Sequence, residues 1–221
     1  ETSPVITVNT EEKFKFGSVG PTVPGVEVKI AEDGEVLTRG PHVMKGYYKN
    51  PEATAETIDK DGWLHTGDIG VLDGNGMLYI TDRKKNIIVT SGGKNVTPAT
   101  IENLLITSPF IEQTMVIGDK RNYLTALIVP SFSALKKFAD ENGISYSDVK
   151  ELLTNEQVYQ AVEADVKKLT KELARFEQVK KFTLMPREFT IADDELTPTL
   201  KVKRKVVAEK YADIINQMYI E

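Results

Sequence analysis

The pattern of apolar residues changes once along the chain, close to residue 83, and this change constrains the fold more than any other feature. Before it, short apolar runs alternate with turns rich in Gly and Asp, and Val26 to Ile30 follow the two-residue period of a half-buried strand. After it, apolar residues also recur every three or four positions, as they do on one face of a helix. The sequence therefore predicts an α+β protein, with a β-rich piece over residues 1–83 and an α+β piece over residues 84–221.

Two hairpins are expected in the β-rich piece. Asp33-Gly34 and the stretch Asp73 to Gly76 each separate two apolar runs and provide turn residues that tolerate unusual backbone angles. A short helix is expected between the hairpins, over Pro51 to Ile58. Asn50 is a suitable N-cap for this helix, and proline is favoured at a first helical position.

The second piece is expected to fold as a small sheet with flanking helices. The best helical pattern runs from Glu156 to about Phe176, and its apolar stripe indicates packing against the sheet or, alternatively, against a partner or a membrane. Gly143 is expected to end a helix that begins near residue 133. The remaining expected helices cover residues 97–108 and 203–219, and the expected strands cover residues 114–118, 125–130 and 180–185.

The stretch "ITDRKKN", residues 80–86, lies at the change of pattern. Arg83, Lys84 and Lys85 interrupt what is otherwise one apolar run that resumes at Ile87. Three explanations remain open on local evidence: a solvated turn, a phosphate-binding patch, or a joint between two domains.

Composition excludes several classes of site. None of the 221 residues is cysteine, so disulfides, cysteine zinc sites and thiolate nucleophiles are absent. His42 and His65 are the only histidines, which disfavours a metal site built on several of them. A net charge of −5 disfavours nucleic acid as a partner. The chain begins at Glu1 without Met, in a strand-like sequence, and we expect it to be a fragment or a trimmed chain.

The densest candidate for chemistry is "GWLHTGD", residues 62–68. Thr66-Gly67-Asp68 is expected to form a tight turn leading into a strand. An aspartate held there presents its carboxylate to a pair of hydroxyls such as those of a ribose. A purely structural turn is the alternative, and His65 is expected to be a hydrogen-bonded structural residue.

Two further stretches allow a ligand-binding interpretation. "TSGGKNVTP", residues 90–98, lacks the Walker spacing and is either a glycine turn or a place where a ligand approaches the backbone. "LTPTLKVKRK", residues 196–205, is expected to be a stiff extended segment before the final helix. Its lysines and arginine are either a solvated basic helix start or, since cations oppose the dipole at a helix N-terminus, a phosphate contact.

Taken in order, these stretches resemble one family over the whole chain. "GEVLTRGPHVMKGYYKNPEATAETIDKDGWLHTGDIG", "YITDRKKNIIVTSGGKNVTPATIE" and "ELTPTLKVKRK" resemble motifs of the adenylate-forming acyl-CoA synthetases. "LARFEQVKKF" adds a similarity to the long-chain fatty acid branch. The resemblance implies the small β-barrel-like end of a large N-terminal domain, followed by a mobile C-terminal α+β domain.

The resemblance also implies a reaction in two steps. ATP and a carboxylate, here a fatty acid, first form an acyl-adenylate with release of diphosphate and with Mg²⁺ as cofactor. Coenzyme A then attacks the adenylate to give the thioester, after the C-terminal domain has rotated. A cytoplasmic protein is expected, with peripheral membrane contact of the full-length enzyme as an additional expectation.

Carried over by position, Asp68 and Arg83 resemble the residues that bind the ribose. Lys85 falls at the hinge position, and Lys84 has no assigned role and is expected to be solvated. Lys201 corresponds to the lysine that reaches the carboxylate and the α-phosphate during adenylation. A cation between these two anions stabilises the crowded transition state.

Gly92 and Gly93 fall in the loop that approaches the pantetheine of coenzyme A, and Glu1 corresponds to a glutamate that helps to hold magnesium. The chain departs from the family at two positions. Val89 stands where many relatives have a lysine, and Leu200 stands where many have a glycine before the catalytic lysine.

The family's phosphate loop and acyl tunnel lie upstream of these motifs, so this polypeptide alone is expected not to make acyl-CoA. The missing N-terminal part of the same enzyme is therefore an expected partner. The alternatives are a synthetase for an aryl or shorter-chain acid, a non-catalytic module that binds nucleotide or coenzyme A, and a basic interaction domain.

Overall fold

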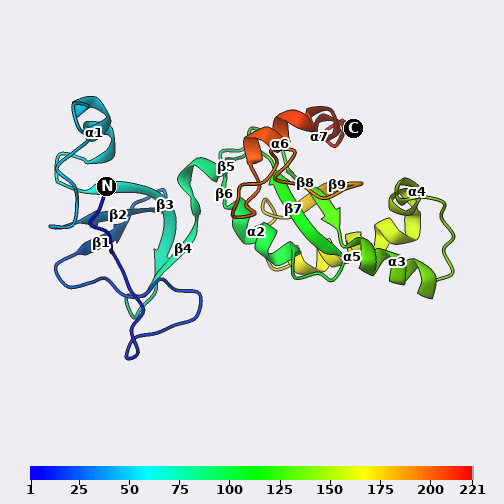
Figure 1. Cartoon of the computed structure of the whole chain (residues 1–221), viewed down its shortest axis with the longest axis horizontal. Helices are drawn as coiled ribbons and strands as arrows, with labels where there is room; N and C mark the ends of the chain where they lie inside the picture. The colour runs from blue at the N-terminus through cyan, green and yellow to red at the C-terminus, as the bar shows by residue number, and fades with distance from the viewer. Residues whose placement is uncertain (221) are drawn as a thin grey trace. The chain divides into compact units, whose positions relative to one another are not determined.

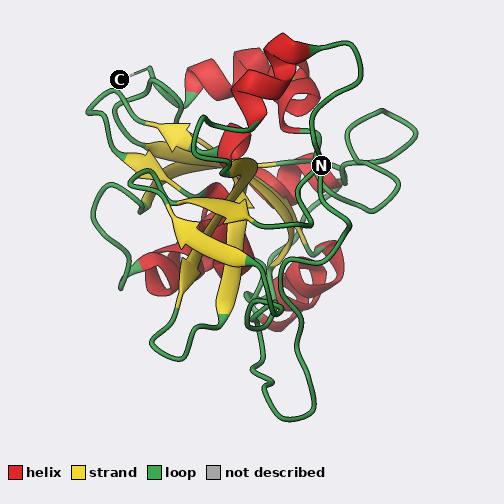
Figure 2. Cartoon of the chain, turned by 90° about the vertical axis from the view of Figure 1, so that its left-hand side faces the viewer, coloured by secondary structure: helices red, strands yellow, loops and turns green. Residues whose placement is uncertain are grey.

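The computed structural model describes residues 1–220, and the chain divides into two compact units, Glu1–Ile87 and Ile88–Glu221. Helices and strands occur in the same chain, coloured red and yellow in Figure 2. The predicted α+β class is therefore confirmed. The units meet four residues after the domain boundary predicted at residues 83 and 84, and that boundary stays a prediction.

The first unit is built on one antiparallel sheet with strand order β1-β2-β3-β4. Its strands are β1 (Glu27–Ile30), β2 (Glu35–Arg39), β3 (Leu64–Leu72) and β4 (Leu78–Arg83), drawn in blue to cyan in Figure 1. The sheet is curled into a half-barrel, which agrees with the β-barrel-like subdomain that was expected. Its core contains Val36, Leu64 and Leu78, each at most 3% exposed.

Both predicted hairpins of this unit are confirmed, since β1 pairs with β2 and β3 pairs with β4. The carboxylate of Asp33 accepts the backbone N–H of Glu35 at 3.1 Å. The carboxylate of Asp73 accepts the N–H groups of Asn75 and Met77 at 2.9 and 3.0 Å. These local bonds replace the ladder bonds that a turning backbone loses.

The short helix of the first unit is also confirmed as α1 (Pro51–Thr57). The side chain of Asn50 accepts the N–H of Ala53 at 3.1 Å, as an N-cap does. No helix in residues 1–220 is long and apolar enough to cross a membrane.

The second unit contains a three-stranded sheet of order β7-β8-β9. The strands are β7 (Ile111–Ile117), β8 (Leu124–Pro130) and β9 (Val179–Leu184). β7 and β8 are antiparallel, whereas β8 and β9 are parallel. Every residue of the central strand β8 is buried, because helices cover both faces of the sheet.

The side chains of β8 alternate between two apolar cores. Ala126 and Ile128 belong to the core shared with one group of helices, and Leu127 and Val129 to the core on the other face. The first face is covered by α2 (Pro98–Leu105), α3 (Phe132–Glu141), α4 (Val149–Thr154) and α5 (Glu156–Thr170). The other face is covered by α6 (Arg204–Lys210) and α7 (Ala212–Gln217).

The packing interpretation of the longest apolar stripe is confirmed, because Val158, Val162 and Val166 of α5 are at most 2% exposed. The predicted length of this helix was wrong, since α5 ends at Thr170 and not near Phe176. The hydroxyl of Thr170 donates to the carbonyl of Val166 at 2.8 Å, a bond that competes with continuation of the helix. The chain then turns and leads into the parallel strand β9.

The final helix predicted over residues 203–219 is instead divided into α6 and α7 at Tyr211. The backbone of Tyr211 has φ −109° and ψ 25°, outside the helical range. Its hydroxyl donates to the buried carboxylate of Glu195 at 2.7 Å, so a tertiary contact fixes the residue at the break. The six-residue helix α4 was not predicted, although Asp148 caps it by accepting the N–H of Glu151 at 2.8 Å.

Candidate functional site

Asp68 and Arg83 lie side by side in the first unit, as cross-strand partners on β3 and β4. The Nε atom of Arg83 is 2.7 Å from Oδ1 of Asp68, and the two side chains are 60% and 28% exposed. The two residues expected to contact a ribose, fifteen positions apart in the sequence, are thus brought together at an accessible surface.

A β-bulge presents this carboxylate. Glu35 pairs with Ile69 and Leu37 pairs with His65, so Thr66, Gly67 and Asp68 of β3 lie opposite one residue of β2. Gly67 has φ +70°, which glycine adopts at little cost. The expectation of a tight turn before a strand was therefore wrong, because the three residues form an interruption inside β3.

Glu35 lies beneath the bulge, and its side chain is 4% exposed. Its carboxylate accepts the N–H of Gly67 at 3.0 Å and contacts Nδ1 of His65 at 2.8 Å. Nζ of Lys84 donates to the same carboxylate at 2.8 Å. Burial raises the pKa of Glu35, but the bonds from Lys84, His65 and Gly67 outweigh burial and leave this pKa below its ordinary value.

The structural interpretation of His65 is confirmed by this contact, whereas the role of Glu35 was not anticipated from the sequence. Lys84 is exposed, as expected of a solvated residue, but it also has two ion-pair partners. Its Nζ lies 2.7 Å from the carboxylate of Asp33 and 2.8 Å from that of Glu35. Hydrogen bonds to Asp33 and Glu35 raise the pKa of Lys84, because both favour its charged form.

Lys84 begins the short 3₁₀ turn η1 (Lys84–Asn86), which brings its side chain over the first hairpin. Asn86 at the other end of η1 donates to the carboxylate of Asp82 at 3.0 Å. Lys85 between them is exposed, and its side chain has no hydrogen-bond or ion-pair partner in residues 1–220. Its assignment to a hinge stays a prediction.

Gly92 and Gly93 lie in the loop between the short strands β5 (Ile88–Val89) and β6 (Asn95–Val96) of the second unit. Gly93 has φ +72°, and a Cβ atom at this position would meet nothing within 4 Å. The glycine-turn interpretation is confirmed, and the loop also leaves open space for a ligand. Binding of coenzyme A here stays a prediction.

Lys201 lies on a closed loop before α6, so the expectation of a stiff extended segment was wrong. Thr197 donates its N–H to the carbonyl of Lys201 at 2.8 Å, and its hydroxyl accepts the N–H of Lys201 at 3.0 Å. Leu200 has φ +60° and is 69% exposed. The loop therefore requires the left-handed backbone that glycine adopts most easily.

We expect Leu200→Gly to stabilise the second unit by about 0.5–1 kcal/mol. A leucine in the left-handed region costs about 1–2 kcal/mol, and the greater freedom of glycine in the unfolded chain cancels about 0.5–1 kcal/mol of the gain. Chemical denaturation measures the difference. Thr199→Gly is the control and should destabilise, since Thr199 has no positive φ. A lower stability for Leu200→Gly would contradict the proposed strain.

The basic run around Lys201 divides into two kinds of residue. Lys203 is paired with Asp194, and Arg204 is paired with Glu102 and with the carbonyl of Val116. Lys201 and Lys205 are exposed and have no ion pair in residues 1–220. The paired cations therefore attach the loop to its surroundings, and Lys201 remains available to an anion.

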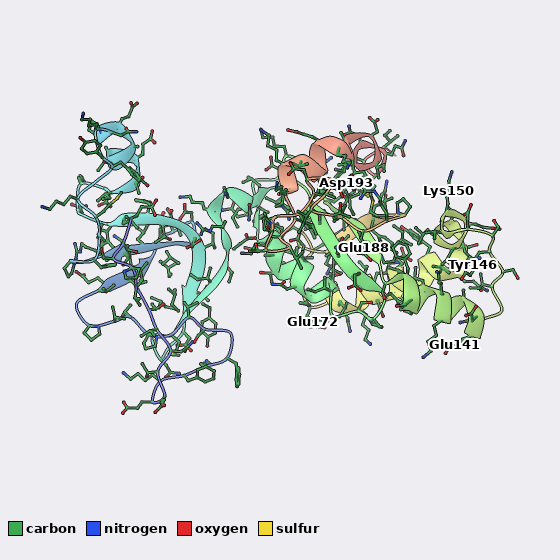
Figure 3. All side chains as sticks on the ribbon, in the orientation of Figure 1. Glu141, Tyr146, Lys150, Glu172, Glu188 and Asp193 are labelled. Carbon is green, nitrogen blue, oxygen red and sulfur yellow. The ribbon has the colours of Figure 1, made fainter. Side chains whose placement is uncertain are left out.

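Glu195 anchors the same loop from inside. Its fully buried carboxylate accepts two bonds of 2.8 Å from Arg187, one of 2.7 Å from Tyr211 and one of 3.0 Å from Lys210. Burial raises its pKa, but these donors outweigh burial and lower the pKa to about 2. Arg187 also contacts Asp193 at 3.2 Å, and Figure 3 shows Asp193 beside α6.

Glu1 does not form a metal site with the described residues. Its carboxylate accepts the hydroxyl of Tyr47 at 2.6 Å. No group of three or more His, Asp or Glu residues suited to a metal ion occurs within residues 1–220. A single carboxylate can hold magnesium only together with substrate phosphates and water, so contact of Glu1 with the ion stays a prediction.

Comparison with known families gives a match over residues 85–221, to the family described as AMP-binding enzyme C-terminal domain. Long-chain-fatty-acid–CoA ligase FadD15 of Mycobacterium bovis is 43% identical over 220 residues, covering 99% of this chain and 36% of that protein. Long chain acyl-CoA synthetase 7, peroxisomal, of Arabidopsis thaliana is 37% identical, covering 100% of this chain and 34% of that protein. The chain thus spans about a third of the length of these relatives.

A solved structure of the A domain of carboxylic acid reductase from Segniliparus rugosus, in complex with AMP and a co-purified carboxylic acid, has a similar fold. The TM-score is 0.70 at 28% identity, with 91% of this chain and 32% of that chain covered.

Proposed function

The chain belongs to the AMP-binding enzyme C-terminal domain family, and from this premise we propose that it is the C-terminal part of a long-chain fatty acid–CoA ligase. The carboxylate oxygen of the fatty acid attacks the α-phosphorus of ATP, and diphosphate leaves. The thiol of coenzyme A then attacks the acyl carbon of the adenylate, which releases AMP and gives the thioester.

The pairing of Asp68 with Arg83 is the observation that carries this proposal. A carboxylate beside a guanidinium, on an exposed bulge, offers both an acceptor for ribose hydroxyls and a donor for ribose oxygens. The ion pair orients both groups before the nucleotide arrives. Two similarities support an adenine nucleotide as the ligand of this pair. The chain is similar to relatives whose names include CoA ligase and to a domain solved in complex with AMP.

Lys201 is proposed to act on the first step. It is a cation without a partner on a loop held by Glu195 and Arg204, so it can enter between the carboxylate and the α-phosphate without breaking an ion pair. The attack crowds two anions together, and a fixed positive charge lowers the energy of that arrangement.

Two further ligands belong to the proposal. The open loop at Gly92 and Gly93 is proposed to lie along the pantetheine of coenzyme A, because glycines let a ligand approach the backbone closely. A magnesium ion, when bound to ATP, would neutralise the charge of the departing diphosphate. Glu1 is the one position in this chain proposed to contact that ion.

The test uses the full-length enzyme that contains this segment. We expect exchange of labelled diphosphate into ATP that depends on a long-chain fatty acid, and formation of a long-chain acyl-CoA. A preference for aryl or short-chain acids would replace the substrate class, and no exchange with any acid would favour a non-catalytic binding module. The chain of residues 1–221 alone is expected to give no exchange, since the family's phosphate loop lies upstream.

Peripheral membrane contact of the full-length enzyme in the cytoplasm is part of the same proposal, because long acyl chains partition into lipid. Cosedimentation of the enzyme with phospholipid vesicles tests it. Recovery of all the enzyme in the supernatant would oppose this part of the proposal.

Lys85→Pro in the full-length enzyme should slow one of the two half-reactions about tenfold, equivalent to about 1.4 kcal/mol, and leave the other unchanged. Proline fixes the backbone of residue 85 and disfavours the helical conformation of Lys84, which lies in η1. A pivot restrained in this way favours one domain orientation. Separate assays of adenylation and of thioester formation measure the effect.

Lys85→Ala is the matched control, because it removes the same charge without restraining the backbone, and it should leave both rates unchanged. Equal rates for Lys85→Pro and the unmodified enzyme in both assays would remove the hinge assignment.

A further inference from the structure

We propose that Glu35 is a positioning residue. It holds the ribose-binding bulge, residues 66–68, and Lys84, the residue before the proposed pivot Lys85, in fixed positions relative to each other. The proposal rests on the function proposed above, because it assigns a role within the same nucleotide site. It concerns residues of the first unit only. Two of its contacts are made with Gly67, which precedes Asp68, and with Lys84, which lies between Arg83 and Lys85.

One oxygen of Glu35 holds the bulge. Oε1 accepts the N–H of Gly67 at 3.0 Å, and Gly67 directly precedes Asp68. The hydroxyl of Thr66 accepts the N–H of Asp68 at 3.1 Å and donates to the carbonyl of Val36 at 2.7 Å. Both sides of Gly67 are therefore attached to β2, which sets the direction of the Asp68 carboxylate.

The other oxygen of Glu35 holds the end of β4. Oε2 lies 2.8 Å from Nζ of Lys84 and 2.8 Å from Nδ1 of His65. The same Nζ lies 2.7 Å from Oδ2 of Asp33 in the first hairpin turn. Lys84 is thus clamped by two carboxylates of one hairpin, and Arg83 directly before it is held in register with Asp68.

Burial makes Glu35 the central member of this clamp. Its side chain is 4% exposed, whereas those of Lys84 and Asp33 are 46% and 44% exposed. A buried carboxylate is stabilised by its charged and polar partners, and they are oriented by it in turn. Removal of its charge therefore affects Lys84, His65 and the bulge together.

The clamp keeps the ribose-binding residues Asp68 and Arg83 in place while the chain after Lys85 rotates. The clamp ends at Lys84, and Lys85 is the first side chain after it without a partner among residues 1–220. A rotation that begins at Lys85 leaves Arg83 beside Asp68. The ribose contacts are then the same in the adenylation and thioester-forming orientations, so that the adenylate formed in the first step stays bound for the second.

The test measures steady-state constants of the full-length enzyme. Glu35→Gln keeps an oxygen for Gly67 but directs a neutral amide at Lys84. We expect the KM for ATP in diphosphate exchange and the KM for acyl-adenylate in thioester formation each to rise about tenfold. The kcat of both half-reactions should stay within about twofold, because Lys201 is untouched.

Lys84→Met changes a side chain that is 46% exposed and should reproduce most of both KM increases. The double variant should be no worse than Glu35→Gln alone, because the two residues act through one contact. Glu32→Gln is the matched control, since Glu32 is exposed, lies in the same hairpin and has no hydrogen-bond or ion-pair partner in residues 1–220.

Unchanged KM values in Glu35→Gln, a rise in only one of the two KM values, or additive effects in the double variant would overturn the clamp. A loss of kcat with lowered thermal stability and unchanged KM would show a merely structural residue. An unmodified enzyme without acid-dependent exchange would instead refute the proposed function, so the two failures are distinguishable.

Discussion

Replacement of Lys201 by alanine should reduce acyl-adenylate formation about 10²–10³-fold, the usual effect of removing one group that stabilises transition-state charge. Formation of acyl-CoA from supplied acyl-adenylate should change less than about twofold. The difference follows from the chemistry, since only the first step brings a carboxylate against the phosphates of ATP. Acid-dependent diphosphate exchange and thioester formation from synthetic acyl-adenylate measure the two steps in the full-length enzyme.

Lys205→Ala provides the control, because Lys205 is also exposed and has no ion pair in residues 1–220. It removes the same charge from the same basic run and should leave both half-reactions unchanged. Equal losses in the two half-reactions for Lys201→Ala would count against its assignment, and an equal effect of Lys205→Ala would indicate general electrostatic attraction of ATP.

Glu195→Ala should destabilise the second unit by about 1–3 kcal/mol, the usual cost of leaving hydrogen-bond partners unsatisfied, since Arg187 and Lys210 are 40% and 38% exposed and regain contact with water. Arg187, Lys210 and Tyr211 all lose their common acceptor. Chemical denaturation of this chain, followed by circular dichroism, measures the loss. Hydrogen exchange should locate the weakened protection in residues 185–203, which include the loop of Lys201.

Glu188→Ala is the matched control, because Glu188 is exposed, its side chain has no partner in residues 1–220, and it lies on the same segment. A loss below about 1 kcal/mol in Glu195→Ala, the value typical of exposed ion pairs, would contradict the anchoring role of the buried carboxylate.

The same carboxylate predicts a dependence of stability on pH. The pKa of Glu195 is lowered from 4.5 to about 2 in the folded chain. A group with a depressed folded pKa stabilises the fold above its unfolded pKa, and this contribution is lost as pH falls through the folded value. The free energy of unfolding should therefore fall between about pH 4.5 and pH 2, and less steeply in Glu195→Ala.

The elements correctly predicted from the sequence depend on nearby residues. The turns at Asp33 and Asp73 are closed by bonds to N–H groups two to four positions away. The helix at Pro51 is capped by Asn50 within one turn. Propensity, capping and turn chemistry act over the same few residues, so these elements can be recognised without knowledge of the fold.

The errors and omissions have the opposite origin. Lys84 was expected to be solvated and without a role, yet it is paired with Asp33 and Glu35, which lie about fifty positions earlier in the chain. Tyr211 interrupts a continuous helical pattern, and it contacts Glu195 sixteen positions earlier. Contacts between distant segments decide such details, and no local pattern reports them.

The sequence alone determined the α+β class, both hairpins, the positions of most helices and the resemblance that selects Asp68, Arg83 and Lys201, because these depend on local patterns and on motif order. Only the tertiary structure decided that Asp68 faces Arg83 across a bulge, that Glu35 holds both this bulge and Lys84, and that Lys201 lies on a loop fixed by Glu195. A buried carboxylate reveals its function through the donors that surround it, and those donors come from strands and helices far apart in the chain.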